Sequence, residues 1–216
     1  AFGAALAGKR SFCGMKHVGL NVAADPLFTI AYTGVNAGMV IGVADDPGMH
    51  SSQNEQDSRH YAKASKIMML EPSDSAECKE FTKQAFELSE KFDTPVFVKM
   101  CTRVSHSQSV VETKDRVELP TKTYEKNIAK YVMAPANAIR RHPFVEQRMA
   151  DIEKFALALA DVLPEVDSEL IQTACDNISE YLQPQYNLLT CLRKGIIYHH
   201  GSVPDAIRIY IEDLYK

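Results

Sequence analysis

The sequence has 216 residues and lacks the features that mark several large classes of protein. It contains no apolar run close to the roughly 20 residues that a membrane-spanning helix needs. Its formal net charge is only -4, so electrostatics give the whole chain no basis for binding nucleic acid or a membrane surface. No basic segment precedes the small residues of the opening stretch AFGAALAGKR, which therefore does not read as a signal peptide.

Cysteine is scarce and scattered. The five residues are Cys13, Cys78, Cys101, Cys175 and Cys191. No two of them have the spacing of metal ligands, which argues against an iron-sulfur cluster or a structural zinc site held by this chain alone. An odd, scattered set is typical of reduced thiols, so we expect a cytoplasmic protein with no metal site of its own.

Signatures of common catalytic sites are also missing. The sequence shows no Ser-His-Asp order, no nucleophile elbow and no glycine-rich phosphate loop. What is present suits a globular protein of one large domain or two small ones, with 45% hydrophobic and 24% charged residues. The opening stretch resembles the last turns of a helix ending at Gly8, without an initiator Met or an N-cap, which indicates a fragment.

The first part of the chain alternates short apolar runs with helical patterns. Strands are predicted at 10–17, 38–44, 67–72 and 95–101, and helices at 21–34, 52–65 and 73–93. This alternation predicts an α/β fold in which a parallel sheet has helices on both faces. Such sheets bind their ligands outside the carboxyl ends of the strands.

The pattern changes near residue 108. A charged stretch with three prolines predicts an extended arm, which ends in a helix beginning near Pro143. The last segment predicts a small, mostly helical α/β tail, with helices at 165–182 and 205–216 and a short strand within 192–204. The predicted domains are therefore 1–107, 108–156 and 157–216.

Polar side chains follow the first and last of these strands at their carboxyl ends. Lys16 and His17 precede a helix N-terminus, which suits an anion, or else they form a solvent-exposed pair on a loop. Arg103 and His106 follow the last strand. Arg103 suits bidentate recognition of a carboxylate, or else it pairs with an acidic residue of a neighbouring loop.

The second strand runs into the densest polar cluster, DDPGMHSSQNE, which contains a Pro-Gly turn. Ser52 and Glu55 have the spacing of a capping box for the following helix. That interpretation leaves Asp46, His50 and Gln53 without a role, so a helix cap and a ligand site both remain open.

Four long strings carry a family resemblance: AGKRSFCGMKHVGLNVAADPLFTIAYTGV, VADDPGMHSSQNEQDSRHYAKASKIMMLEPSDSAE, MCTRVSHS and EKNIAKYVMAPANAIRRHPFVEQR. They are similar to the thiamine-diphosphate-dependent 2-oxoacid:ferredoxin oxidoreductases, and among these to the α subunits of indolepyruvate:ferredoxin oxidoreductases. The likeness covers residues 1 to about 156. It implies a pyrimidine-binding domain, a parallel α/β fold that holds one end of thiamine diphosphate.

The resemblance also implies an activity, oxidative decarboxylation of arylpyruvates such as indolepyruvate, with coenzyme A as acyl acceptor and ferredoxin as electron acceptor. The segments KHVGLN, DDPGMHSSQ and TRVSHS would face cofactor and substrate. The implied catalytic residues are His17, His50 and Arg103, and the implied substrate-binding residues are Arg103 and His106. The implied cofactor-binding residues are Lys16, Asn21, Asp46, Ser51, Ser52 and Gln53.

The sequence departs from this family in what it lacks. The glutamate that hydrogen-bonds the aminopyrimidine ring would lie before Ala1. The domain that binds the diphosphate through Mg²⁺ and the cysteine-rich modules for iron-sulfur clusters are absent. The chain is therefore expected to form one half of a cofactor site, to need a β subunit, and to be inactive alone.

The tail carries a second resemblance, in LRKGIIYHHGSVPDAIRIYIEDLYK. It is similar to part of the second RecA-like domain of superfamily 2 helicases, with His199, His200 and Gly201 in a loop near the inter-domain cleft; the alternative is a generic strand-turn-helix. A chimeric or truncated gene product, a natural recombination and a lineage-specific extension all remain open. The competing function is then a nucleic-acid-associated, helicase-related module or a non-catalytic chimera.

Overall fold

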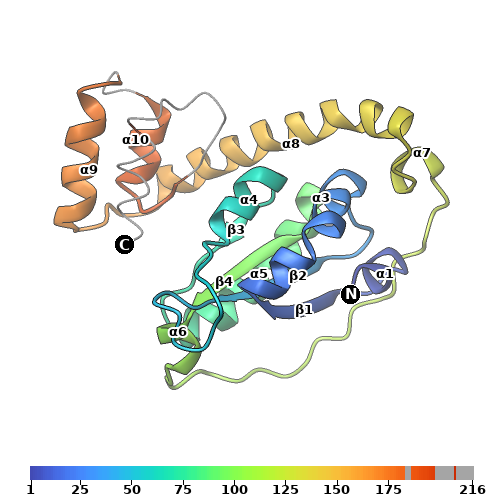
Figure 1. The fold of residues 1–216 in the computed structure, drawn as a ribbon, viewed down its shortest axis with the longest axis horizontal. Helices are drawn as coiled ribbons and strands as arrows, with labels where there is room; N and C mark the ends of the chain where they lie inside the picture. Colours follow the sequence, from blue (N-terminus) through green and yellow to red (C-terminus); the bar gives the residue numbers. More distant parts are fainter. Residues whose placement is uncertain (183–185, 198–206, 208–216) are drawn as a thin grey trace. The chain divides into compact units, whose positions relative to one another are not determined.

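The computed structural model describes residues 1–182, 186–197 and 207 of the chain (Figure 1). The chain divides into two units, Ala1–Glu146 and Gln147–Lys216, and the division falls within the helix α8 (Pro135–Val162). In the described part of the chain, no helix combines the length and apolarity that crossing a membrane requires. The domain boundaries at 107 and 156 remain predictions.

A four-stranded sheet forms the centre of the first unit (Figure 1). Its strands are β1 (Ser11–Lys16), β2 (Met39–Asp45), β3 (Met69–Leu70) and β4 (Val96–Cys101). They lie in the order β1-β2-β4-β3, and every neighbouring pair is parallel. The predicted parallel α/β fold is confirmed, although β3 pairs over fewer residues than the predicted range 67–72.

Helices cover both faces of this sheet. The helices of the first unit before the arm are α1 (Phe2–Leu6), α2 (His17–Val22), α3 (Ala24–Thr33), α4 (Arg59–Ser65), α5 (Ser75–Phe92) and α6 (Thr102–His106). Ile41 and Val43 of β2 belong to a core that α1 to α4 cover. Val40 faces the opposite side, where Ala85 of α5 packs on it, because successive side chains of a strand alternate between faces.

The helix α5 begins with a side-chain cap. Asp74 accepts a hydrogen bond from the Glu77 N–H at 2.8 Å, so Asp74 and not Ser73 is the N-cap. Glu77 in turn accepts from the Ser73 hydroxyl at 2.8 Å and from the Ser73 N–H at 2.7 Å. At the other end, Asp93 adopts a left-handed conformation with φ of 51° that ends the helix.

Two predicted helices have different bounds. The helix predicted at 21–34 is two helices, because α2 begins at His17 and α3 follows it at Ala24. The helix predicted at 52–65 begins only at Arg59. Its predicted capping box does not form, because Glu55 accepts from the Gly48 N–H at 2.9 Å instead, and the Ser52 hydroxyl donates to Asp46.

Residues 107–127 contain no helix or strand, as expected of an extended arm. The Lys122 N–H donates to the Gly8 carbonyl at 3.0 Å, and Lys122 Nζ lies 3.0 Å from a carboxylate oxygen of Glu90. In the short helix α7 (Ile128–Tyr131), Lys130 Nζ donates to the Asp93 carboxylate at 2.8 Å. These contacts hold the arm and α7 against the rest of the first unit.

The helix α8 begins at Pro135 and contains Pro143, so the predicted start near Pro143 is wrong. Either proline suits a first helical turn because its fixed φ matches the helix. Pro135 takes that position, and the Asn137 and Ala138 N–H groups both donate to the Ala134 carbonyl at 2.9 Å. Pro143 removes one internal hydrogen bond, which the remaining turns of this long helix tolerate.

In its described residues, the second unit contains α9 (Glu169–Ser179) and α10 (Asn187–Leu192). Their apolar faces share a core of Ala174, Cys175, Ile178, Leu188, Leu189 and Leu192. Ser168 caps α9 by accepting a hydrogen bond from the Ile171 N–H at 3.4 Å. The amphipathic helix predicted at 165–182 is therefore present with shorter bounds.

The strand predicted within 192–204 overlaps the described residues only at its start. Leu192 ends α10, and Ile196 and Ile197 have no strand pairing. His199, His200 and Gly201, which carry the helicase likeness, lie outside the described residues. The predicted helix at 205–216 lies outside them too, except for residue 207.

Candidate functional site

The carboxyl ends of β1, β2 and β4 meet at one edge of the sheet. These strands are neighbours and run parallel, with Lys16 of β1 paired to Ala44 of β2, and Asp45 of β2 paired to Cys101 of β4. The segments that follow the three strands therefore leave the sheet side by side. This is the edge where parallel sheets bind ligands.

Asp46, the first residue after β2, connects all three segments. One carboxylate oxygen accepts hydrogen bonds from the Ser51 N–H at 2.8 Å and the Ser52 hydroxyl at 2.7 Å. The other accepts from the Thr102 hydroxyl at 3.0 Å, and Lys16 Nζ lies 3.6 Å from the first. These contacts, the Ser52 hydrogen bond foremost, hold the pKa of Asp46 well below its usual range. The nearly buried side chain is therefore an ionised carboxylate in which both oxygens accept hydrogen bonds.

Lys16 completes this group from β1. Its Nζ donates to the Ser51 carbonyl at 2.7 Å and to the Ser52 hydroxyl at 2.6 Å, in addition to the ion pair with Asp46. Two of the three N–H donors of the ammonium group thus make hydrogen bonds. The side chain remains 42% exposed, which leaves its outer surface accessible to a ligand.

A surface depression of about 410 Å³ lies over these contacts. We call it the hollow, and it is lined by Lys16, Val18, Ser51, Ser52 and Gln53. Its volume falls in the range of about 300 to 1,000 Å³ that small-molecule sites occupy. All but Val18 were candidate residues from the sequence, so the structure brings these four predicted residues together.

His17 lies directly beneath this edge with a fully buried side chain. Its Nε2 is 3.0 Å from the Asn54 carbonyl, which can only accept, so Nε2 carries the hydrogen. Its Nδ1 is buried and has no hydrogen-bond partner among the described residues. The ring therefore connects the start of α2 to the loop after β2 and is shielded from solvent.

The remaining candidate residues lie away from the hollow's lining. Asn21 Nδ2 donates to the Tyr61 hydroxyl at 2.5 Å on the surface. His50, Arg103 and His106 have exposed side chains, and the described residues form no ion pair with Arg103. Their roles, like those of the hollow's lining residues, remain predictions.

The segments KHVGLN and TRVSHS were expected to be loops and are mostly helical. The short helices α2 and α6 begin at His17 and Thr102, directly after β1 and β4. Only the segment after β2 is a true loop, and it extends to Ser58 before α4 begins. We call residues 46–58 the site loop.

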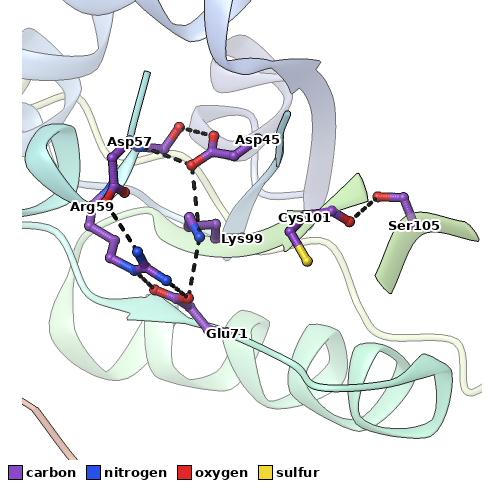
Figure 2. A network of polar contacts seen from close by, with 8 residues as sticks. Asp45, Asp57, Arg59, Glu71, Lys99, Cys101 and Ser105 are labelled. Carbon is purple, nitrogen blue, oxygen red and sulfur yellow. Dashed lines mark hydrogen bonds and ion pairs between the residues drawn. The ribbon is translucent and has the colours of Figure 1, made fainter. Parts of the chain in front are cut away.

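A second polar cluster supports the site loop from the opposite face of the sheet, and Figure 2 shows it. Asp45 accepts hydrogen bonds from the Ser58 N–H at 2.9 Å and from the Ser58 hydroxyl. Lys99 of β4 has a side chain only 7% exposed, and its Nζ lies 3.8 Å from Asp45 and 3.3 Å from Glu71. Lys99 is thus a buried cation between two carboxylates.

Arg59 extends this cluster at the start of α4 (Figure 2). Its guanidinium contacts Glu71 through two hydrogen bonds, of 2.5 and 2.8 Å, and lies 3.1 Å from Asp57. Burial would lower the pKa of Arg59, but the hydrogen bonds and charge of Glu71, together with Asp57, raise it above its ordinary value. Sequence reasoning missed this cluster, although the charged Lys99 inside the apolar run PVFVKMC was a signal for it.

No group of three or more His, Cys, Asp or Glu residues suited to a metal ion occurs in the described part of the chain.

Comparison with known proteins gives a consistent match. The family model of the pyruvate flavodoxin/ferredoxin oxidoreductase thiamine-diphosphate-binding domain matches residues 1–173. A protein of Archaeoglobus fulgidus named indolepyruvate oxidoreductase subunit IorA is 46% identical over 160 residues, 72% of this chain and 25% of that protein.

Two further relatives bear the same name. The protein of Methanothermobacter thermautotrophicus is 49% identical over 153 residues, which is 70% of this chain and 25% of its own length. The protein of Methanothermobacter marburgensis is 51% identical over 149 residues, which is 68% of this chain and 24% of its own length. The chain thus spans about a quarter of the length of these curated relatives.

Proposed function

The chain belongs to the family of pyruvate flavodoxin/ferredoxin oxidoreductase thiamine-diphosphate-binding domains, and we propose that its hollow receives the pyrimidine end of the coenzyme. One observation carries this proposal. Asp46 connects the segments after β1, β2 and β4, so that Lys16, Ser51 and Ser52 face a common depression. Ligand sites of parallel sheets lie at this edge.

The hollow fits an aminopyrimidine ring in size and chemistry. Val18 offers an apolar surface for the ring, and the hydroxyls of Ser51 and Ser52 and the amide of Gln53 offer hydrogen-bonding groups for its nitrogens. None of its lining residues is a carboxylate, and both oxygens of Asp46 already accept hydrogen bonds from the protein. These residues therefore suit binding and orientation, and the carboxylate expected to bond the ring must come from outside the lining.

When bound, thiamine diphosphate supplies the carbon nucleophile for decarboxylation of a 2-oxoacid. The residues of this chain orient the ring and shield one side of it from water. Arg103 is proposed to hold the carboxylate of the 2-oxoacid, with His106 beside it on α6, because Thr102 at the start of that helix bonds Asp46. His50 and Asn21 are proposed to hydrogen-bond the substrate, and His17 to act at the same edge.

The complete enzyme is proposed to be an indolepyruvate:ferredoxin oxidoreductase, because relatives about three times as long as this chain bear the name indolepyruvate oxidoreductase. In it this chain's counterpart would work with a β subunit, oxidise arylpyruvates, pass electrons to ferredoxin and transfer the acyl group to coenzyme A. Mg²⁺, the diphosphate site and the iron-sulfur clusters would belong to other parts of the assembly.

The test is an NMR titration of the isotope-labelled chain with the two ends of the coenzyme separately. We expect 4-amino-5-hydroxymethyl-2-methylpyrimidine to shift the amide signals of Ser51, Ser52 and Gln53, with weak affinity because this is half of a site. Inorganic pyrophosphate serves as the control and should leave these amides unchanged. A response to pyrophosphate alone, or no response to the pyrimidine up to its solubility limit, would refute the proposal.

A further inference from the structure

Two successive aspartates leave β2 toward opposite faces of the sheet. Asp45 contacts Lys99 and Ser58 on the face where Ile41 and Val43 lie, because side chains two residues apart on a strand share a face. Asp46 contacts Lys16 instead. The two carboxylates are therefore adjacent in the chain but contact different parts of the site loop.

Asp46 fixes the near half of the site loop. It accepts hydrogen bonds from the Ser51 N–H and the Ser52 hydroxyl, which turns the chain back over the strand that it has just left. Both serines line the hollow. The carboxylate thus shapes the lining without itself being part of it.

Asp45 fixes the far end of the same loop. It accepts from both the N–H and the hydroxyl of Ser58, a fully buried residue that precedes α4. Lys99 neutralises Asp45 from β4 and also contacts Glu71 next to β3. A buried ion pair of this kind is weak evidence for stability, but its geometry selects one conformation over others.

Between these two ends lie the groups that the site uses. Gln53 completes the lining, and the Asn54 carbonyl accepts the only hydrogen bond that the described residues make with the buried His17 ring. A shift of the far end of the loop would therefore move both groups. The shape of the hollow depends on contacts on both faces of the sheet.

We infer that Asp45, Asp46 and Lys99 are positioning residues, which hold the two ends of the site loop independently and so pre-shape the hollow for its ligand. Lys99 affects the site loop through Asp45, because its ammonium group holds the Asp45 carboxylate where it accepts the hydrogen bonds of Ser58. The identity of that ligand rests on the proposed function. The two points where the loop is attached rest on the structure alone.

Hydrogen exchange of two backbone amides tests the inference without any ligand. The Ser51 N–H reports the Asp46 contact and the Ser58 N–H reports the Asp45 contact. In Lys99→Met we expect Ser58 to exchange at least about tenfold faster, with Ser51 changed by less than about twofold. In Asp46→Ala we expect the reverse pattern.

A variant that keeps the positive charge at position 99 distinguishes an effect of the charge from an effect of side-chain packing. Lys99→Arg should keep the Ser58 exchange rate within about threefold of the wild type, because the cation is retained. Lys66→Met is the matched control, since Lys66 pairs with Glu146 on the surface, and both reporter amides should stay unchanged. The amides of the central strand β2 report opening of the whole sheet.

Each result decides the inference. It is overturned when Ser51 and Ser58 respond together in every variant, when Lys99→Arg behaves like Lys99→Met, or when neither amide responds. Where Lys99→Met does not fold, Lys99→Gln removes the same charge, keeps a polar side chain and should accelerate Ser58 alone. Hydrogen exchange is measured without a ligand. A negative pyrimidine titration would therefore refute the proposed function without affecting this result.

Discussion

Glu90, near the end of α5, joins three segments of the first unit, and its replacement tests how strongly they are held. Its carboxylate accepts hydrogen bonds from the Arg10 guanidinium at 3.0 and 3.2 Å, and from the Gly38 N–H at 3.0 Å. Lys122 of the arm lies 3.0 Å away. We predict that Glu90→Gln lowers the free energy of unfolding by about 2 to 3 kcal/mol at pH 7.

The magnitude follows from the ionisation of this carboxylate. Burial alone would raise the pKa of Glu90, but the hydrogen bonds from Arg10, the Gly38 N–H and Lys122 lower it from 4.5 to about 2. Because one pKa unit equals about 1.4 kcal/mol, the ionised form contributes about 3 kcal/mol to stability at neutral pH. Glutamine keeps a carbonyl acceptor for Arg10 and loses the charge, so the expected loss is slightly smaller.

The pH dependence has a definite sign. The pKa of Glu90 is lower in the folded state than in the unfolded state, so its contribution is fully present well above pH 4.5 and is lost as the pH falls toward about 2. At pH 3.5, linkage predicts that about 1.4 kcal/mol of it has gone.

Urea unfolding at pH 7 and pH 3.5, followed by circular dichroism, measures both quantities for the wild type and Glu90→Gln. Glu87→Gln, at an exposed position of the same helix, is the control and should change stability by less than about 0.5 kcal/mol. An equal difference between wild type and Glu90→Gln at the two pH values would refute the reasoning.

Three further predictions concern the core, a helix cap and the candidate site. Phe97, near the start of β4, is fully buried, so Phe97→Ala should lower the free energy of unfolding by about 3 to 5 kcal/mol in urea. A loss below about 1 kcal/mol would contradict the described core. Asp74→Ala removes the N-cap of α5 and should cost about 1 kcal/mol by the same assay, whereas Asp74→Ser should cost much less. Because the pKa of Asp46 is lowered, its carboxyl carbon should keep the NMR shift of an ionised group as the pH falls through the range where ordinary aspartates titrate; titration in that range would show that the Ser52 and Ser51 contacts are absent.

Much of the fold could be predicted because its signals are local. Short apolar runs indicate β2 and β4, because most residues of both strands are buried whichever face they lie on. The helix predicted at 73–93 was equally plain and corresponds to α5. The parallel arrangement also predicted that the segments of Lys16 and Asp46 leave the same edge of the sheet, and these two residues lie in contact there. That this edge binds a ligand stays a prediction.

The side-chain partners within that region could not be predicted, because they depend on which strands are neighbours. Ser52 and Glu55 have capping-box spacing, yet Ser52 bonds Asp46, a long-range competitor that spacing does not reveal. Thr102 reaches Asp46 because β4 inserts beside β2 although β3 precedes it in the chain. Strand order is set by packing of the whole sheet, which a local pattern does not contain.

The supporting cluster beneath the site suggests a more general signal. Lys99 follows Phe97 on one face of β4, and Asp45 follows Val43 on the same face of β2, because side chains two residues apart share a face. In each strand the earlier residue lies in the apolar core and the later one forms an ion pair. This change from apolar to charged within one face shows where the core ends and the ligand edge begins. Opposite charges at that point on two neighbouring parallel strands therefore predict a buried pair that supports the adjoining loop.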